Sequence, residues 1–302
     1  MASTGYPPTQ PGADPLNLWG NAREGSEVPT ELQSRPQPAD RRRASGDAPA
    51  VAVERVSRTY HGEGGTTVRA LADVSLHATG GELLAVVGPS GCGKSTLLEL
   101  ICGLQQPDSG RVACAPAVLM PQRDLLLPWL SALDNAALAL RIARVPRARA
   151  RAQASALFDE LGLDGFQQAR PHELSGGMRQ RVAFARTLLS GKSLLCLDEP
   201  FGALDAITRG EMQEWLARTL AAQPRTTRPT ASTALSRTVV LVTHDVEEAI
   251  LLADRVAVLS RRPGRVVAEL AVEIAHPRSR TDPEVLALRE RALSALGAGE
   301  PL

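Results

Sequence analysis

Short, uninterrupted apolar runs recur along the chain and predict buried strands. The clearest are residues 83–87, 194–197 and 239–242, with another near Val256. Continuous runs of this length are typical of strands covered on both faces, and helix-compatible segments separate them. This alternation predicts an α/β fold with a mostly parallel central sheet.

Two further parts of the pattern differ from this core. Residues 51–56 and 68–76 are predicted strands of an antiparallel β subdomain that presents Tyr60. Between about residues 123 and 187 the pattern becomes helical, with alanine- and leucine-rich or otherwise helix-favouring segments at 132–144 and 147–161. We therefore expect an inserted α-helical subdomain.

Changes in composition suggest the domain limits. Residues 1–49 are rich in Pro, Gly, Ser and charge and lack an apolar signal core, so we expect a disordered tail in the cytosol. Residues 50–270 would form one nucleotide-binding domain, with a Thr-, Pro-, Ser- and Arg-rich surface insertion at about 221–236. Residues 271–302 are predicted to form a C-terminal helical extension.

The overall composition excludes several classes of protein. The 302 residues are 43% hydrophobic, which suits one domain with a sizeable core. With 34 basic and 33 acidic residues, the net charge of +1 predicts no nucleic-acid partner, although a local basic patch stays open. No apolar stretch approaches the roughly 20 residues that span a bilayer. Four cysteines without CxxC spacing suit reduced thiols in a bacterial-type cytoplasm.

The segment after the first core strand matches the phosphate-loop pattern GxxxxGK[ST]. It consists of Gly88, Pro89, Ser90, Gly91, Cys92, Gly93, Lys94, Ser95 and Thr96. In such a loop the backbone N–H groups surround phosphates, Lys94 places a charge near the terminal phosphates, and the Ser95 hydroxyl can ligate Mg²⁺. The alternative is a glycine-rich turn that binds nothing. The strand before it and the helix-compatible segment after it favour nucleotide binding.

Two later strands also end in residues that could act on a nucleotide. One ends at Asp198 and Glu199, whose side chains should point to opposite sides, although the alternation does not say which acid has which role. The other ends at His244, which could donate a hydrogen bond to a terminal phosphate. A solvated strand end is the alternative interpretation of the two acids, and a structural or merely exposed histidine is the alternative for His244.

A second anion-binding surface is predicted at the run LSGGMRQR, residues 174–181. Its glycines open a helix, where unpaired N–H groups and the helix dipole favour a phosphate. The chain already has one phosphate loop. Ser175, Gly176 and Gly177 are therefore best explained as serving a nucleotide held by a partner subunit.

In their order along the chain and in their sequences, these motifs resemble those of the ATP-binding cassette (ABC) ATPase family. The resemblance implies a P-loop NTPase core of RecA type that uses ATP and Mg²⁺. It implies that Asp198 helps to hold Mg²⁺, that Glu199 orients or deprotonates water, and that His244 senses the terminal phosphate. It further implies that Gln122 contacts Mg²⁺ and water, that Tyr60 stacks on adenine, and that Asp205 couples two ATP sites across a dimer. For Gln122 an ordinary loop amide is the alternative.

Within the family, residues 124–129 and 260–266 look like those of importer ATPases for nitrate, sulfonate, taurine and related solutes. Importers of thiamine-precursor pyrimidines are similar, so the solute stays open. The resemblance implies a homodimer at the cytoplasmic face of the membrane, with integral-membrane permease subunits and a periplasmic or lipoprotein solute-binding protein as partners. Pro128 and Trp129 would lie near the permease groove, or serve only loop packing. The short segment 111–120 and the insertion depart from the usual pattern.

Two other functions compete with transport. One is a soluble ABC ATPase that acts on nucleic acid or ribosomes, although such proteins usually carry long coiled coils or two cassettes in one chain. The other is a nucleotide-binding regulator without turnover, which steady ATP hydrolysis in the presence of a permease would exclude.

Overall fold

The computed structural model describes residues 49–221 and 237–297. The predicted N-terminal tail, apart from Pro49, and the predicted insertion, apart from Ala221, lie outside the described residues. Among the helices of the described ranges, none is long and apolar enough to cross a bilayer.

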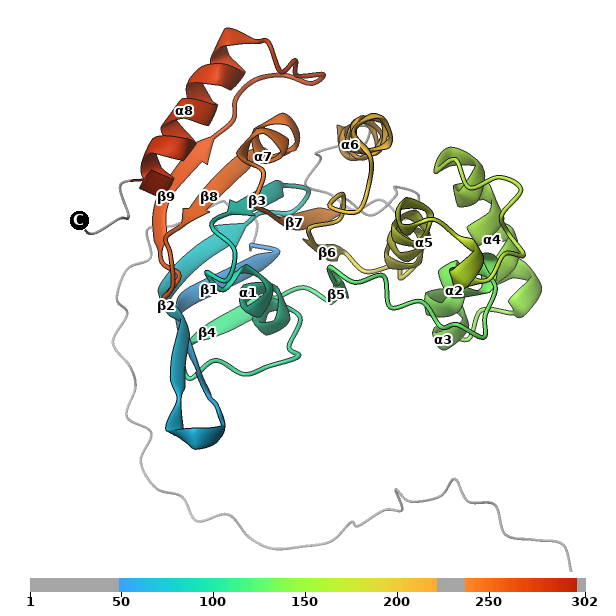
Figure 1. The fold of residues 1–302 in the computed structure, drawn as a ribbon, viewed down its shortest axis with the longest axis horizontal. Helices are drawn as coiled ribbons and strands as arrows, with labels where there is room; N and C mark the ends of the chain where they lie inside the picture. The colour runs from blue at the N-terminus through green and yellow to red at the C-terminus, as the bar shows by residue number, and fades with distance from the viewer. Residues whose placement is uncertain (1–48, 222–236, 298–302) are drawn as a thin grey trace, which may run out of the picture. The chain divides into compact units, whose positions relative to one another are not determined.

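A central sheet forms the middle of the fold (Figure 1). In the described ranges its strands, in spatial order, are β5 (Ala117–Met120), β6 (Leu194–Asp198), β7 (Thr238–Thr243), β3 (Leu83–Val87), β8 (Arg255–Leu259) and β9 (Val266–Ala271). All neighbouring pairs are parallel except β8 with β9. The sheet therefore matches the mostly parallel arrangement that the apolar runs predict.

Alternate residues of the central strands face two different cores. In β3, Leu83, Ala85 and Val87 pack with one apolar cluster. Leu84 and Val86 pack with the other. Because successive side chains on a strand point to opposite faces, burial on both sides requires an unbroken apolar run. This explains why these strands are visible in the sequence.

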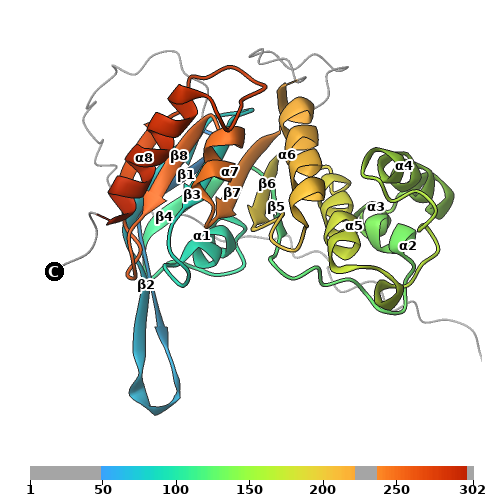
Figure 2. The ribbon, with the colours of Figure 1, turned by 45° about the horizontal axis from the view of Figure 1, so that its top comes forward.

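Different elements cover the two faces of the central sheet (Figures 1 and 2). Helices α6 (Ala206–Ala221), α7 (Val246–Leu252) and α8 (Pro283–Gly297) contribute to one cluster. Helix α1 (Lys94–Ile101) and a second sheet contribute to the other. In the extension predicted over 271–302, the described helix is α8 alone, and Ala271 still belongs to β9.

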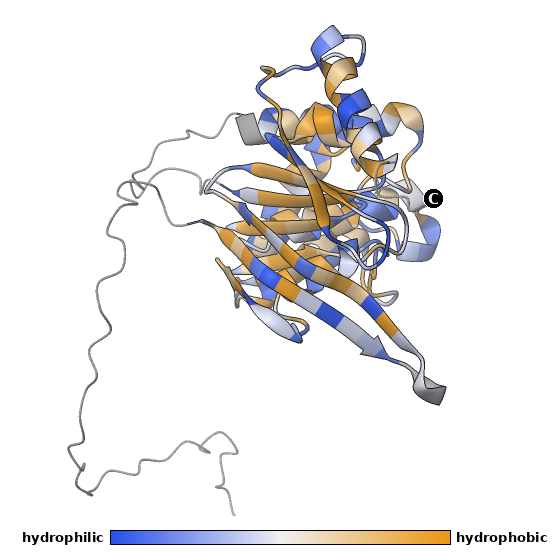
Figure 3. Ribbon diagram, turned by 90° about the vertical axis from the view of Figure 1, so that its left-hand side faces the viewer, coloured by the Kyte–Doolittle hydropathy of each residue, from blue (hydrophilic) through white to orange (hydrophobic). Residues whose placement is uncertain are grey.

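The second sheet is antiparallel, with strand order β2-β1-β4. Its strands are β1 (Val51–His61), β2 (Thr67–Ala78) and β4 (Ser109–Cys114), and the short helix η1 (Glu63–Gly65) joins β1 to β2. Both β1 and β2 extend beyond their predicted limits. Most of the residues beyond these limits, at 57–61, 67 and 77–78, are polar and partly or fully exposed, and the hairpin carries hydrophilic bands in Figure 3. A search for apolar runs therefore ends too early.

A group of helices follows β5 and lies beyond the edge of the central sheet (Figure 2). It comprises α2 (Ala132–Ala136), α3 (Leu138–Ile142), α4 (Arg147–Glu160), η2 (Pro171–Glu173) and α5 (Gly176–Leu188). The helix-favouring segment 132–144 contains two short helices, which are separated at Ala137, where the backbone ψ is −7°. Phe158 of α4 and Phe184 of α5 are buried in the shared core.

Candidate nucleotide site

The phosphate loop connects β3 to the first turn of α1, and its glycines are required by geometry. Gly93 has a φ of 108°, and a Cβ there would lie 2.8 Å from the Ala70 carbonyl oxygen. A Cβ on Gly88 would lie 2.8 Å from the Cys92 sulfur. Since a side chain at either position would clash, the loop can approach β2 and fold over itself only with glycine.

Lys94 is the first residue of α1, and its side chain is buried under this loop. The Lys94 ammonium donates hydrogen bonds to the carbonyl oxygens of Gly88, at 2.8 Å, and Pro89, at 3.0 Å. These bonds hold the cation at the positive end of a helix. An anion bound here would meet both a fixed charge and the helix dipole.

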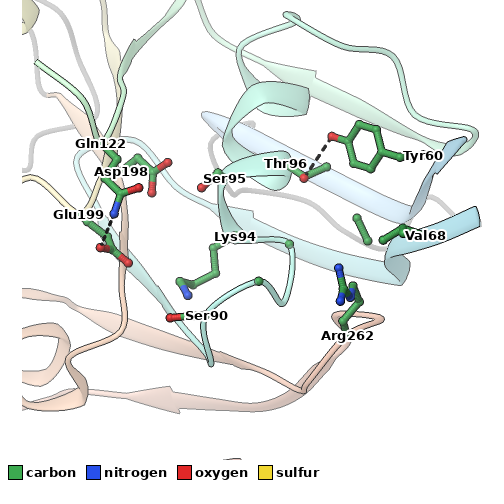
Figure 4. A pocket seen from close by; sticks show the side chains of 13 residues that line it. Tyr60, Val68, Ser90, Lys94, Ser95, Thr96, Gln122, Asp198, Glu199 and Arg262 are labelled. Carbon is green, nitrogen blue, oxygen red and sulfur yellow. Dashed lines mark hydrogen bonds between the residues drawn. The ribbon is translucent and has the colours of Figure 1, made fainter. Parts of the chain in front are cut away.

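A pocket of about 320 Å³ opens over the phosphate loop (Figure 4). Its lining brings together most of the predicted site residues, namely Tyr60, Ser90, Gly91, Gly93, Lys94, Ser95, Thr96, Gln122, Asp198 and Glu199. Val68, Ala70 and Arg262 also line it. The predicted residues outside its lining are Gly88, Pro89, Cys92, His244, Ser175, Gly176, Gly177 and Asp205. We name this space the ATP pocket, after the nucleotide that the sequence resemblance leads us to expect there.

Glu199 is held at both of its carboxylate oxygens. The Gln122 side-chain amide donates to Oε2 at 3.0 Å, and His244 Nδ1 lies 3.1 Å from Oε1. Glu199 has a φ of 47°, a left-handed conformation that costs a non-glycine residue about 1–2 kcal/mol. Although His244 is outside the pocket lining, it reaches the site through Glu199. Three elements far apart in sequence thus converge on one carboxylate.

Asp198 lies at the end of β6 and is only 7% exposed. Burial raises the pKa of its carboxyl, and the neighbouring Glu199 carboxylate acts in the same direction. The Ser95 hydroxyl and the Lys94 ammonium lower the pKa and partly oppose this effect. A buried carboxylate beside a hydroxyl and an ammonium is arranged to meet a cation bound to phosphate.

Tyr60 closes the end of the pocket away from the acids (Figure 4). Its hydroxyl lies 3.2 Å from Thr96 Oγ1 and donates to Gln105 Oε1 at 3.1 Å. The Arg58 guanidinium lies 5.1 Å from the centroid of the ring. These contacts fix the orientation of an aromatic ring beside the pocket, where a flat base could stack. Arg58 and Gln105 had no predicted role, because only the fold brings β1 together with the loop that follows α1.

The predicted second anion site lies apart from this pocket. Ser175 caps α5 by accepting a hydrogen bond from the Met178 N–H at 3.2 Å, and Ser175 and Gly176 are exposed. Asp205 is also exposed and accepts hydrogen bonds from the N–H groups of Ile207 and Thr208, both at 3.1 Å. The structure therefore does not bring Ser175, Gly176, Gly177 and Asp205 into their own chain's pocket.

A glycine loop between a parallel strand and a helix, with strand-end acids opposite the loop lysine, defines a P-loop nucleoside triphosphatase. A family model described as "ABC transporter" matches residues 71–202. The aliphatic sulfonates import ATP-binding protein of Rhodococcus jostii is 45% identical over 238 residues, covering 76% of this chain and 88% of the relative. The taurine import ATP-binding protein of Chromobacterium violaceum is 40% identical over 262 residues, covering 81% of this chain and 95% of that relative.

The fold is also similar to that of a solved ATP-binding cassette, described as dimeric, in a post-hydrolysis state and bound to ADP and Pi. The TM-score is 0.64 at 28% identity, covering 74% of this chain and all of the solved one. The chain belongs to the ABC transporter family of ATPases.

Proposed function

We propose that the protein is the ATP-hydrolysing subunit of an ABC importer, and that it drives uptake of a small solute through a separate permease. The observation that carries the hydrolytic part is the placement of Glu199, held by Gln122 and His244 in the pocket that also contains Lys94. The import part rests on the sulfonate and taurine importer subunits that the chain resembles.

In this proposal Glu199 orients a water molecule and accepts its proton. The water oxygen then bonds to the terminal phosphorus of ATP as the bond to the bridging oxygen breaks, giving ADP and phosphate. Gln122 and His244 hold the carboxylate in place. Phosphoryl transfer depends mainly on positioning and charge neutralisation, so the fixed geometry of these side chains supports the assignment.

Mg²⁺ fits the donors on this chain. The described residues contain no group of three or more His, Cys, Asp and Glu side chains that could hold a metal ion. The ATP pocket instead offers the Ser95 hydroxyl, the Gln122 amide and one buried carboxylate, Asp198. Mg²⁺ is usually held by one or two carboxylates together with substrate phosphates, where it neutralises phosphate charge. We assign these three side chains to it.

A head-to-tail dimer would complete each site. Ser175 and Gly176 are exposed at the N-terminus of α5 and do not line their own chain's pocket. Such an N-terminus binds phosphate, and the related cassette is described as dimeric. We infer that Ser175, Gly176 and Gly177 contact the nucleotide of the partner subunit. Asp205, exposed at the start of α6, would lie at the same interface.

The helical group α2–α5 would receive the permease. Leu125 and Trp129 are 59% and 68% exposed on the segment that leads from Gln122 to α2. The backbone at Trp129 is held by a hydrogen bond from Arg170 to its carbonyl oxygen. An exposed aromatic residue on a fixed backbone is typical of a protein interface. Together with Pro128, this segment is our candidate surface for the permease, which would place the protein at the cytoplasmic face of the membrane.

The transported solute is proposed by class. The relatives import aliphatic sulfonates and taurine, and both carry a sulfonate group. We propose a small sulfonate-like or similar oxyanion solute, delivered to the permease by a separate solute-binding protein. A thiamine-precursor pyrimidine is the remaining alternative for this type of cassette.

The test is to purify tagged Glu199→Gln protein with ATP from gently solubilised native membranes and to identify its partners by mass spectrometry. Recovery of a multi-spanning permease would support the proposal if proteoliposomes of that permease and the unmodified protein hydrolyse ATP in response to a sulfonate with its binding protein. Recovery of ribosomal proteins or DNA-bound factors would favour the rival non-transport ATPase and leave the ATP site intact. Absence of steady hydrolysis with the permease would favour a regulator without turnover.

A further inference from the structure

Arg262 lines the ATP pocket, although none of the motifs of the nucleotide site includes it. It lies in the turn at residues 260–265, between β8 and β9. In Figure 4 its guanidinium lies near Val68 on the same side of the pocket as Tyr60, whereas Asp198 and Glu199 lie on the other side, beyond Lys94. Arg262 is therefore a second cation in the pocket, at the end away from the acids.

Backbone hydrogen bonds fix the turn against β2. The Ala72 N–H donates to the Gly264 carbonyl at 3.0 Å, and the Gly264 N–H donates to the Ala70 carbonyl at 2.9 Å. Within the turn, the Ser260 N–H donates to the Arg265 carbonyl at 2.9 Å, and the Arg265 N–H donates to Ser260 Oγ at 3.1 Å. The base of the Arg262 side chain is thus held by main-chain bonds.

Gly264 also brings the turn into direct contact with the phosphate loop. A Cβ at Gly264 would lie 2.3 Å from the Cys92 carbonyl oxygen and 3.3 Å from a Leu71 methyl group. Only glycine permits this approach. Because the turn touches both β2 and the phosphate loop, the position of Arg262 is set by the same backbone that forms the ATP pocket.

The Arg262 guanidinium is available for a ligand. Within residues 49–221 and 237–297 no carboxylate lies within ion-pair distance of it. The pocket carboxylate of Glu199 is already engaged by Gln122 and His244. Arginine presents a planar fork of donors that suits phosphate and ribose oxygens, and it stays charged at all ordinary pH values.

We propose that Arg262 binds the ribose and α-phosphate end of the nucleotide, as a second cationic contact beside Lys94. This inference rests on the ATP site proposed above. Lys94 would serve the terminal phosphates from beneath the loop, and Arg262 would serve the opposite end from the rim near Val68. Since ATP and ADP share their ribose and α-phosphate, the contact would bind both nucleotides equally and would not sense hydrolysis.

The test measures the binding of unlabelled ATP and ADP by equilibrium dialysis in EDTA, where hydrolysis does not interfere. We expect Arg262→Gln to weaken both nucleotides by a similar factor, about five- to twentyfold, and Arg262→Lys to restore part of the loss. Arg261→Gln is the matched control, because Arg261 is the neighbour in the turn and does not line the pocket. It should bind both nucleotides as the unmodified protein does.

Unchanged affinity of Arg262→Gln for both nucleotides would overturn the inference, and so would a loss confined to ATP. Thermal unfolding of each variant establishes that it is folded. Lys94→Ala separates this inference from the proposed function. If Lys94→Ala loses ATP while Arg262→Gln keeps it, the site stands and the role of Arg262 fails. If the unmodified protein binds neither nucleotide, the proposed function itself fails.

Discussion

Arg179 Nε donates a hydrogen bond to Asp124 Oδ2 at 3.0 Å, and this ion pair joins the loop after Gln122 to the helix that carries Ser175 and Gly176. The same loop is held by Arg186, which donates to the carbonyl oxygens of Asp124 and Leu125 at 2.7 and 2.9 Å. Gln122 itself contacts Glu199. These contacts form a continuous chain from Glu199 to α5, and the variant Asp124→Asn tests whether they transmit a change at the terminal phosphate.

Asp124→Asn should uncouple hydrolysis from the permease. The pair is about one-third exposed, so its loss should change the free energy of unfolding by no more than about 1 kcal/mol. We expect nearly unchanged ATPase activity without the permease and a permease-stimulated rate lower by about two- to thirtyfold. Glu54→Gln, which breaks the exposed Glu54–Arg111 pair on the antiparallel sheet, is the control and should leave both rates unchanged. Full stimulation of Asp124→Asn would exclude the ion pair from coupling.

Glu199→Gln should keep ATP binding and lose turnover. The amide has nearly the shape of the carboxylate but cannot accept a proton from water, so the hydrolysis rate should fall by about a hundredfold or more. Dialysis measures binding, and phosphate release measures turnover. The exposed Glu290 on α8 offers a control, since Glu290→Gln should behave as the unmodified protein. Ordinary turnover by Glu199→Gln would show that another group acts as the base.

Glu248→Gln should stabilise the protein at neutral pH. Burial raises the pKa of Glu248 above its ordinary value of 4.5, with Asp245 adding to the rise and Thr243, Gln213 and Arg209 opposing it. Because the pKa is higher in the folded protein than in the unfolded chain, the folded protein holds the proton more tightly. The protonated Glu248 therefore contributes to the free energy of unfolding below about pH 4.5, and this contribution is lost as the pH rises through the folded-state pKa. The Gln variant keeps an acceptor for Gln213 and avoids this loss.

Urea unfolding of both proteins between pH 4 and 8 tests this. The advantage of Glu248→Gln should be smallest at the acid end, grow as the pH rises through the folded pKa, and then level off. The exposed Glu214 provides a control on α6, and Glu214→Gln should show no such pH dependence. A constant difference at all pH values would mean that packing, and not charge, separates the two proteins.

Two glycine substitutions should change stability in opposite directions. Gly264→Ala places a Cβ 2.3 Å from the Cys92 carbonyl, so we expect a loss of about 1–3 kcal/mol in unfolding free energy and weaker ATP binding. Gly210 lies inside α6, and no atom lies within 4 Å of the place that a Cβ would occupy. Gly210→Ala should therefore raise the free energy of unfolding by about 0.5–1 kcal/mol and leave ATP binding unchanged. Equal stability of the two variants would contradict the close contact at Gly264.

The sequence predicts the central strands well because burial on both faces leaves an unbroken apolar run, as in β3. It predicts β1 and β2 too short because most residues missed at their ends, such as Arg58, Thr59 and His77, are polar and do not continue the apolar pattern. It does not predict the break at Ala137 that separates α2 from α3, because that break depends on a single backbone angle. The local hydrophobic pattern therefore predicts which elements form, whereas the positions of their ends depend on solvent exposure and tertiary contacts.

The residues of the candidate site likewise fall into those that the sequence identifies together and those that only the fold brings together. The phosphate loop is contiguous, so its residues are recognised together. Glu199 meets Gln122, which lies 77 positions away, and His244, which lies 45 away, only after β5, β6 and β7 align. The segment 260–266 resembles importer ATPases, but nothing in it marks Arg262 as a residue of the pocket, because its place there depends on the hydrogen bonds between Gly264 and β2. A residue positioned by long-range contacts alone is not identifiable from spacing.

We propose that Ser175 of a partner subunit completes each ATP site. The most direct test is the mass of Glu199→Gln protein, measured by light scattering during gel filtration with ATP, with ADP and without nucleotide. We expect a dimer with ATP only. When Ser175→Arg is added, we expect a monomer under all three conditions, while dialysis still detects bound ATP. A monomer of Glu199→Gln with saturating ATP, or an ATP-dependent dimer that tolerates Ser175→Arg, would contradict the account.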